Sequence, residues 1–115
     1  MSKRQEAFDK IVAAMAAQNW ERSLSAMGSS CRYRGVGGRV CAIGALLDDD
    51  EALVCDHRNC GAHNLPIAIE DRLVADTGFD RSELVPIQRA HDDGDVGMLE
   101  KFRVLADHMN LEMKL

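Results

Sequence analysis

The stretch CRYRGVGGRVCAIGALL, residues 31–47, decides how this chain can fold. Cys31 and Cys41 flank a glycine-rich segment, and an apolar run follows the second cysteine. CRYR alternates in polarity and carries Tyr33, which is typical of a short strand. The GVGG segment has the freedom for positive φ that a hairpin loop needs. We therefore predict a β-hairpin near residues 31–41, with a helical turn after Cys41.

The segments on either side of this hairpin show the signals of helices. Five apolar residues share one face of a helix predicted at about residues 3–19, namely Phe8, Ile11, Val12, Met15 and Ala16. The acidic run at residues 48–51 favours a helix start, because it places negative charge at the positive end of the helix dipole. Pro66 and Gly78 then bound a predicted helix at residues 66–77.

Two more helices are predicted near the C-terminus. One begins near Ser82 and holds Pro86 in its first turn, where a missing N–H is tolerated. The last carries four apolar residues on one face, namely Met98, Phe102, Leu105 and Met109. The sequence thus predicts a mainly helical α+β fold with four to five helices and one short β-hairpin.

The length and composition suit one domain over residues 1–115. The chain is 46% hydrophobic, so it can bury a core, but only 4% aromatic, so aliphatic side chains must fill that core. No run of eighteen apolar residues occurs, and MSKRQEAFDK lacks the apolar stretch of a signal peptide. We expect a cytoplasmic protein, whose four cysteines are reduced thiols or metal ligands.

The charge is unevenly distributed along the chain. Residues 1–47 hold seven Lys/Arg and three Asp/Glu, whereas residues 48–115 hold seven and sixteen. This acidic part argues against nucleic-acid binding, which needs clustered cations. Arg32, Arg34 and Arg39, with Tyr33 among them, form one small patch of candidate binding residues. A protein partner, or a second copy of the chain, is expected instead.

The densest group of potential metal ligands lies in CDHRNCGAH. It places Cys55, His57, Cys60 and His63 within nine residues, and these are donor types that zinc prefers. The spacing matches no familiar zinc motif, because one short loop would have to surround the ion. A mixed site completed by Cys31 or Cys41 is an alternative, and so is a polar loop with no metal.

Cys41 is a second candidate for chemistry. At a helix N-terminus near Arg39 its pKa would fall, which favours the nucleophilic thiolate. His91 could then act as the base and Asp92 or Asp93 as the group that orients it. The alternative is structural, with Cys41 as a small core residue and His91 as part of an apolar helix face.

Two stretches resemble a known group of proteins. The pattern C-x-Y-R-G-x-x-G-x-x-C-A-I-G-A-L at residues 31–46 and LVPIQRAHD at residues 84–92 are similar to those of small proteins of bacteriophages and bacterial genomes that have no assigned activity. The likeness covers most of the chain in outline and implies a phage or prophage setting in the host cytoplasm. It draws attention to Cys31, Tyr33, Arg34, Gly35, Gly38, Cys41, Gly44, His91 and Asp92. CDHRNCGAH is outside the pattern, which leaves a pairing of Cys31, Cys41 and His91 open.

Three functional hypotheses follow from these observations. The first is a non-enzymatic phage or prophage accessory protein that acts by protein–protein contact, for example on a host or defence protein. The second is a binding module stabilised by zinc on Cys and His. The third is a cysteine-dependent hydrolase or transferase that uses Cys41 and His91.

Overall fold

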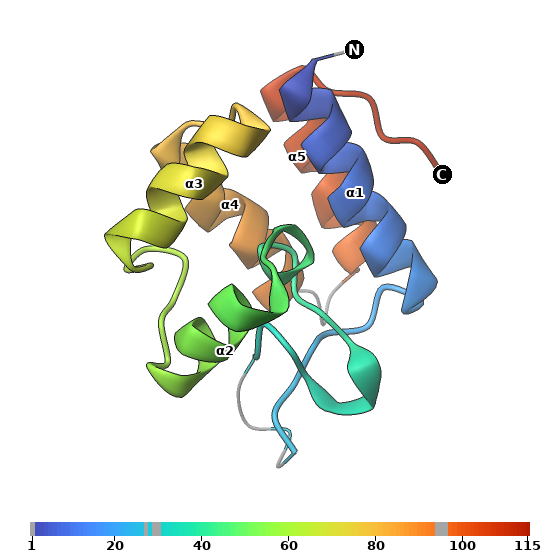
Figure 1. Ribbon diagram of the computed structural model, residues 1–115. Helices are drawn as coiled ribbons and strands as arrows, with labels where there is room; N and C mark the ends of the chain where they lie inside the picture. Colours follow the sequence, from blue (N-terminus) through green and yellow to red (C-terminus); the bar gives the residue numbers. More distant parts are fainter. Residues whose placement is uncertain (1, 27, 29–30, 94–96) are drawn as a thin grey trace.

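The computed structural model describes residues 2–26, 28, 31–93 and 97–115, and within these ranges the fold is all-helical (Figure 1). Five α-helices follow one another as α1 (Lys3–Ala17), α2 (Asp49–His57), α3 (Ile67–Thr77), α4 (Arg81–Asp92) and α5 (Met98–Met109). Short 3-10 turns occur at Val36–Gly38 and Gly44–Leu46. The α+β class predicted from the sequence is therefore wrong.

The predicted β-hairpin is the reason for that error. The chain does reverse near residues 31–41, but the described part of it forms only isolated antiparallel bridges, at Leu24–Cys31 and Arg34–Val40. Hydrogen bonds with side chains replace the backbone hydrogen bonds that pair the strands of a β-sheet. The Asp56 carboxylate accepts hydrogen bonds from the N–H groups of Tyr33 and Arg34, at 2.9 and 3.0 Å. Because these backbone groups are paired with side chains, no second strand is needed to satisfy them.

The Gln18 side chain supports the other arm of this reversal. Its Oε1 accepts the Val40 N–H at 3.0 Å, and its Nε2 donates to the Val40 carbonyl at 2.7 Å. The amide thus replaces both hydrogen bonds that a neighbouring strand would make. Gly37 and Gly38 have φ of 76° and 75°, so the loop does use the freedom that the glycines were predicted to supply.

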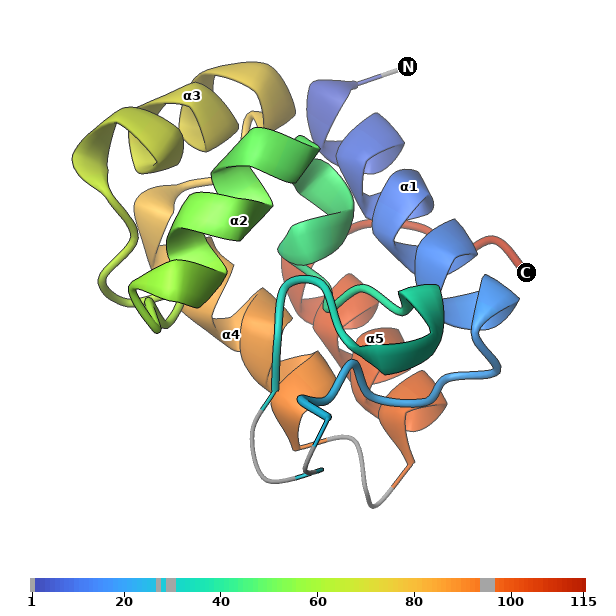
Figure 2. The same cartoon turned by 60° about the horizontal axis from the view of Figure 1, so that its bottom comes forward.

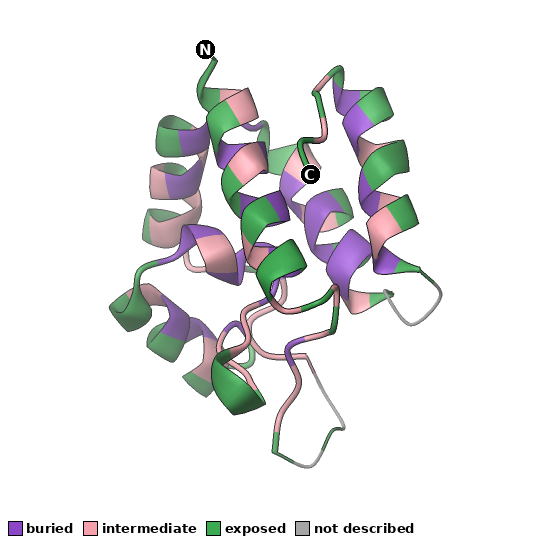
Figure 3. Cartoon of the chain, turned by 90° about the vertical axis from the view of Figure 1, so that its right-hand side faces the viewer, coloured by how far each residue is buried: buried purple, intermediate pink, exposed green. Residues whose placement is uncertain are grey.

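Helices α4 and α5 pack against each other, and α1 lies beside α5 (Figure 1). Helix α1 also contacts α3 and the 3-10 turn at Gly44–Leu46. The segment between α1 and α2 crosses the ends of α4 and α5 (Figure 2). Buried residues face inward from all five helices (Figure 3). The ring centroid of Phe102 lies 6.4 Å from that of Phe8 and 6.1 Å from that of Trp20, which joins α5 to α1 and to the crossing segment.

The helix ends follow local signals that the sequence carries. Asp48 and Glu51 form a capping box at the start of α2, and Asp80 and Glu83 form another at the start of α4. Gly78 ends α3 in the left-handed conformation, with φ of 73°. The first capping box agrees with the predicted helix start at the acidic run. The left-handed Gly78 agrees with the predicted helix end at Thr77.

Pro86 departs from its prediction. Helix α4 begins at Arg81, so Pro86 is its sixth residue and lies beyond the first turn. A proline there removes the N–H that would donate to the carbonyl of Ser82. The expectation that Pro86 occupies the first turn is wrong, because the Asp80–Glu83 capping box starts the helix before Ser82. Each helix in the described part of the chain is too short or too polar to span a lipid bilayer.

Candidate functional site

The two stretches singled out by the resemblance, residues 31–46 and 84–92, meet in space although 37 residues lie between them. The Gln88 Oε1 accepts the Ile43 N–H at 3.0 Å, which joins the two stretches. The His91 Nε2 accepts the N–H of Ser23, which precedes the first stretch, at 2.8 Å. Gly44 lets the first stretch fold closely on itself, because a Cβ at that position would lie 2.5 Å from the Tyr33 carbonyl oxygen. The C-terminal half of α4 thus contacts the crossing segment at Ser23 and Ile43.

Cys31, His91 and Asp92 form a compact group at this junction. One ligand atom from each lies within 4.8 Å of the other two. His91 is fully buried, Cys31 is half-buried, and the Asp92 side chain retains 37% of its exposure. The His91 Nδ1 lies 2.8 Å from the Asp92 Oδ1. Since Nε2 accepts a hydrogen bond from Ser23, the proton of the neutral ring belongs on Nδ1, where it is donated to Asp92.

The Asp92 carboxylate is the acceptor at the centre of this group. It accepts from Gln88 Nε2 at 2.8 Å, from His91 and from the Cys31 thiol. Burial by itself favours the neutral acid, but these donors outweigh it and hold the pKa of Asp92 below its usual value. The site therefore contains a carboxylate that is charged at neutral pH beside a protonated thiol.

A small cavity of about 80 Å³ adjoins this group. Three of the four cysteines line it, together with other residues of the same junction: Cys31, Arg32, Tyr33, Cys41, Cys60, Gly61, Ala62, Gln88 and Asp92. The Tyr33 hydroxyl donates to the Cys60 carbonyl at 2.8 Å, which closes one wall. Loss of hydration raises the pKa of Cys31 to about 11 and that of Cys41 to about 12, so both thiols are protonated at neutral pH.

Cys41 and His91, which the enzyme hypothesis pairs, do not contact each other. Cys41 is buried, and its Sγ accepts the Gly44 N–H at 3.2 Å. Both ring nitrogens of His91 have other partners, namely Ser23 and Asp92. Asp92 does orient His91, as the hypothesis required, but the nucleophile and the base are not joined. The cysteine-dependent enzyme remains a prediction without geometric support.

The four residues of CDHRNCGAH are spread over different environments. Cys55 is buried on α2, and burial raises its pKa to about 11. His57 and His63 are exposed, whereas Cys60 lines the small cavity. In the described part of the chain, the group of close metal-ligating atoms is Cys31, His91 and Asp92. Of the proposed zinc ligands, the structure brings only Cys31 into such a group.

The predicted basic patch is engaged within the molecule. The Arg32 guanidinium donates to the Asp56 carbonyl at 2.8 Å, and Arg39 pairs with Glu21. The Arg34 guanidinium donates to the carbonyls of Gly44 and Leu47, at 2.6 and 2.9 Å. These contacts hold the crossing segment in place. The three arginines and Tyr33 therefore have a structural role.

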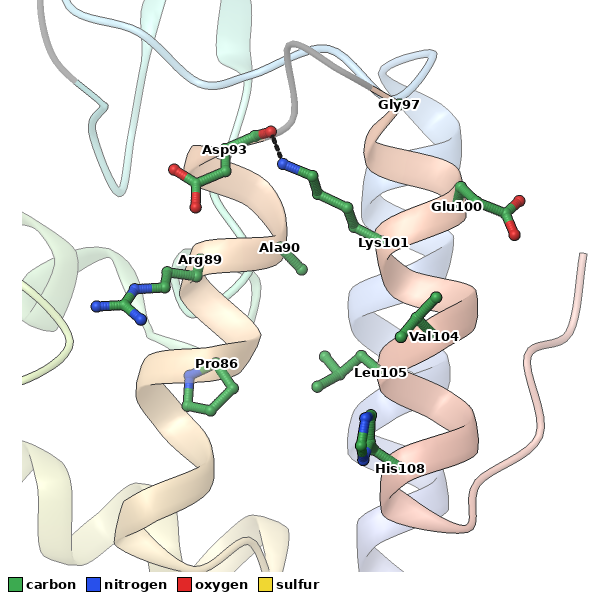
Figure 4. A pocket seen from close by; sticks show the side chains of 10 residues that line it. All are labelled: Pro86, Arg89, Ala90, Asp93, Gly97, Glu100, Lys101, Val104, Leu105 and His108. Atoms are coloured by element: carbon green, nitrogen blue, oxygen red, sulfur yellow. Dashed lines mark hydrogen bonds between the residues drawn. The ribbon is translucent and has the colours of Figure 1, made fainter.

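A second site lies between α4 and α5 (Figure 4). Two adjoining hollows of about 380 and 300 Å³ share Pro86, Leu105 and His108 and together form a groove along both helices, which we call the α4–α5 groove. Val104 borders it and is 52% exposed. Sequence analysis missed this groove, although Pro86 and Val104, two apolar residues outside the predicted helix faces, were a signal of it.

Charged side chains lie at the two edges of the α4–α5 groove and at one end of it. Arg89 projects from the α4 edge and Glu100 from the α5 edge, while Ala90 and Leu105 point into the space between the helices (Figure 4). At the end of the groove near Gly97, Lys101 reaches from α5 to the Asp93 carbonyl (Figure 4). An apolar floor between charged edges is the arrangement by which proteins accept an amphipathic helix.

Comparison with known proteins adds no assignment to these sites. No protein-family model, no curated protein and no solved structure matches the chain.

Proposed function

We propose that this protein is a small phage or prophage accessory protein that acts by binding another protein through the α4–α5 groove. Modulation of a host or defence protein is one form of this activity. The phage setting follows from the sequence resemblance alone. The single observation that carries the binding function is the apolar groove with exposed side chains on both walls.

The size and lining of the groove fit a short apolar segment of a partner. Its two hollows have the volumes of ordinary ligand pockets, which are roughly 300–1,000 Å³. Its floor is formed by apolar residues, Pro86, Ala90 and Leu105, so an apolar side chain can replace water against them.

Charge at the edges specifies the partner further. The occupant we propose is an amphipathic helix with an acidic flank toward Arg89 and a basic flank toward Glu100. Such edge charges favour one orientation of the bound helix and speed its association more than they tighten it. The apolar ridge of the guest would supply most of the affinity.

A site-specific photo-crosslinker tests this proposal. We expect a crosslinker in place of Val104 to give one discrete adduct in lysate of the host cell, and the variant Val104→Asp to remove the same partner from a pull-down. Ile67 on α3 is the matched control position, because it is apolar and 69% exposed but lies outside the groove.

The outcomes separate the alternatives. Adducts of equal yield from Val104 and Ile67 would mean that any exposed apolar residue captures protein, and the groove would lose its assignment. An adduct of twice the mass of the chain would show that the occupant is a second copy. No adduct at Val104 under any condition would contradict the proposal.

A further inference from the structure

We propose that Cys31, His91 and Asp92 form a binding site for a zinc ion. Their three ligand atoms already lie within 4.8 Å of one another, and the residues come from two segments of the chain, residue 31 on the crossing segment and residues 91–92 on α4. Thiolate, imidazole and carboxylate are the three side-chain ligands that zinc uses in proteins. This site is independent of the α4–α5 groove.

The required movement is small. Zinc–ligand distances of about 2.0–2.3 Å place two ligands of a tetrahedral ion roughly 3.3–3.7 Å apart. The His91 Nδ1 and the Asp92 oxygen, now 2.8 Å apart, must therefore separate slightly. The Cys31 Sγ must approach from no more than 4.8 Å. Rotations of the Cys31 and Asp92 side chains can supply this change, since both are partly exposed.

The surroundings also suit an ion. The adjoining cavity of about 80 Å³ opens onto Cys31 and Asp92 and can hold a water molecule as the fourth ligand. Gln88, whose Nε2 donates to Asp92 at 2.8 Å, would orient the carboxylate as residues beside zinc ligands commonly do. Magnesium and calcium are disfavoured, because they prefer oxygen ligands to a thiolate.

Binding has a structural consequence at Ser23. When zinc takes the Nδ1 lone pair, the Cys31 thiol loses its proton to solvent and the ring proton moves to Nε2. The Ser23 N–H, which now donates to Nε2 at 2.8 Å, would then face another N–H group. The Ser23 N–H must therefore move away. Zinc binding would break the hydrogen bond between Ser23 and His91, which holds the crossing segment against α4. A bond between the ion and Cys31 would hold the segment in its place.

The test measures metal binding and this local change on the full chain. We expect one zinc ion per chain by calorimetric titration with zinc chloride. We also expect hydrogen exchange at the Ser23 amide to speed up at least about tenfold, while amides in the core of α4 exchange no faster. Cys31→Ser should weaken zinc binding by about 100-fold or more, since a hydroxyl is a poor ligand.

Two further variants distinguish the loss of a zinc ligand from a general disturbance of the fold. Cys60→Ser is the matched variant, because Cys60 lines the same cavity but lies outside the three-residue group, and it should bind zinc as the wild type does. Asp92→Asn keeps a hydrogen-bond acceptor for His91 and tests the ligand if Cys31→Ser fails to fold. Equal loss in Cys60→Ser, or zinc binding that leaves exchange at Ser23 unchanged, would overturn the assignment.

Discussion

The helices α1, α4 and α5 are held against one another by apolar side chains, whereas the segment between α1 and α2 is held mainly by side chains that bond to its backbone. Phe8 and Phe102 represent the first kind of contact, with both rings fully buried. Asp56 and Gln18 represent the second, since the Asp56 side chain makes two hydrogen bonds to the backbone of the segment and the Gln18 side chain makes three.

The difference concerns how specific each kind of contact is. Apolar burial is non-directional, so a helix pair tolerates several combinations of side chains of suitable volume. A side chain that replaces a strand must place two atoms correctly at one position, and losing it leaves backbone donors unpaired. The crossing segment therefore depends on a few single residues, while the helices depend on the sum of many.

The largest effect is expected where the apolar contacts concentrate. Phe102→Ala removes a ring that is fully buried against Phe8 and Trp20, so we expect a loss of about 3–5 kcal/mol in the free energy of unfolding. Chemical denaturation measures it. Val104→Ala, on the same helix but 52% exposed, should change the free energy by less than about 0.5 kcal/mol. Similar losses in both variants would contradict the packing described.

The polar half of the comparison is tested at Asp56. Asp56→Ala leaves the amides of Tyr33 and Arg34 without their acceptor, and we expect a loss of about 2–3 kcal/mol. Hydrogen exchange at these two amides should accelerate more than exchange in α5. Asp107→Ala removes an exposed carboxylate on α5 and serves as the control. Unchanged exchange at Tyr33 and Arg34 would show that Asp56 does not hold the segment.

A smaller effect, visible in its pH dependence, is expected at the ion pair of Arg4 with Glu83, which joins α1 to α4. The hydrogen bond from Arg4 holds the pKa of Glu83 below its usual value. Its contribution is therefore complete above the unfolded-state pKa and is lost as the pH falls through the lower folded-state pKa. Glu83→Gln keeps an acceptor for the capping box but removes the charge.

The measurement is the free energy of unfolding from neutral pH down to about pH 3. At neutral pH we expect Glu83→Gln to lose about 1 kcal/mol or less, because the pair is partly exposed. On acidification below the usual glutamate pKa the difference from the wild type should shrink. Glu100→Gln, which alters an exposed carboxylate, is the control; a gap that widens with acid would reverse the sign predicted here.

The same comparison explains what sequence reasoning could and could not achieve. The helices were readable because apolar periodicity, Pro66, Gly78 and the acidic helix starts are local signals. The hairpin was misread because its pattern says where the chain turns, and not which groups satisfy its backbone. Those groups are on Gln18, Asp56 and Gln88, far from it in the sequence.

The candidate sites show the same limit. Cys31, His91 and Asp92 were each singled out from the sequence. Their proximity depends on how α4 packs against the crossing segment, and residue spacing does not predict that packing. The close spacing of Cys55, His57, Cys60 and His63 is misleading, because part of that stretch is helical and the two histidines are exposed. The α4–α5 groove depends on the packing of two helices, so it could not be predicted from either alone.

Pro86 makes the two ends of the α4–α5 groove chemically different. Because residue 86 has no N–H, the carbonyl of Ser82 lacks the donor that a regular helix would provide four residues later. Ser82 and Pro86 both line the hollow at the N-terminal end of α4. A bound helix whose hydrogen-bond donor reached this carbonyl would gain a hydrogen bond that the reversed orientation could not form. One cyclic residue can thereby make two otherwise similar ends of a binding surface distinguishable.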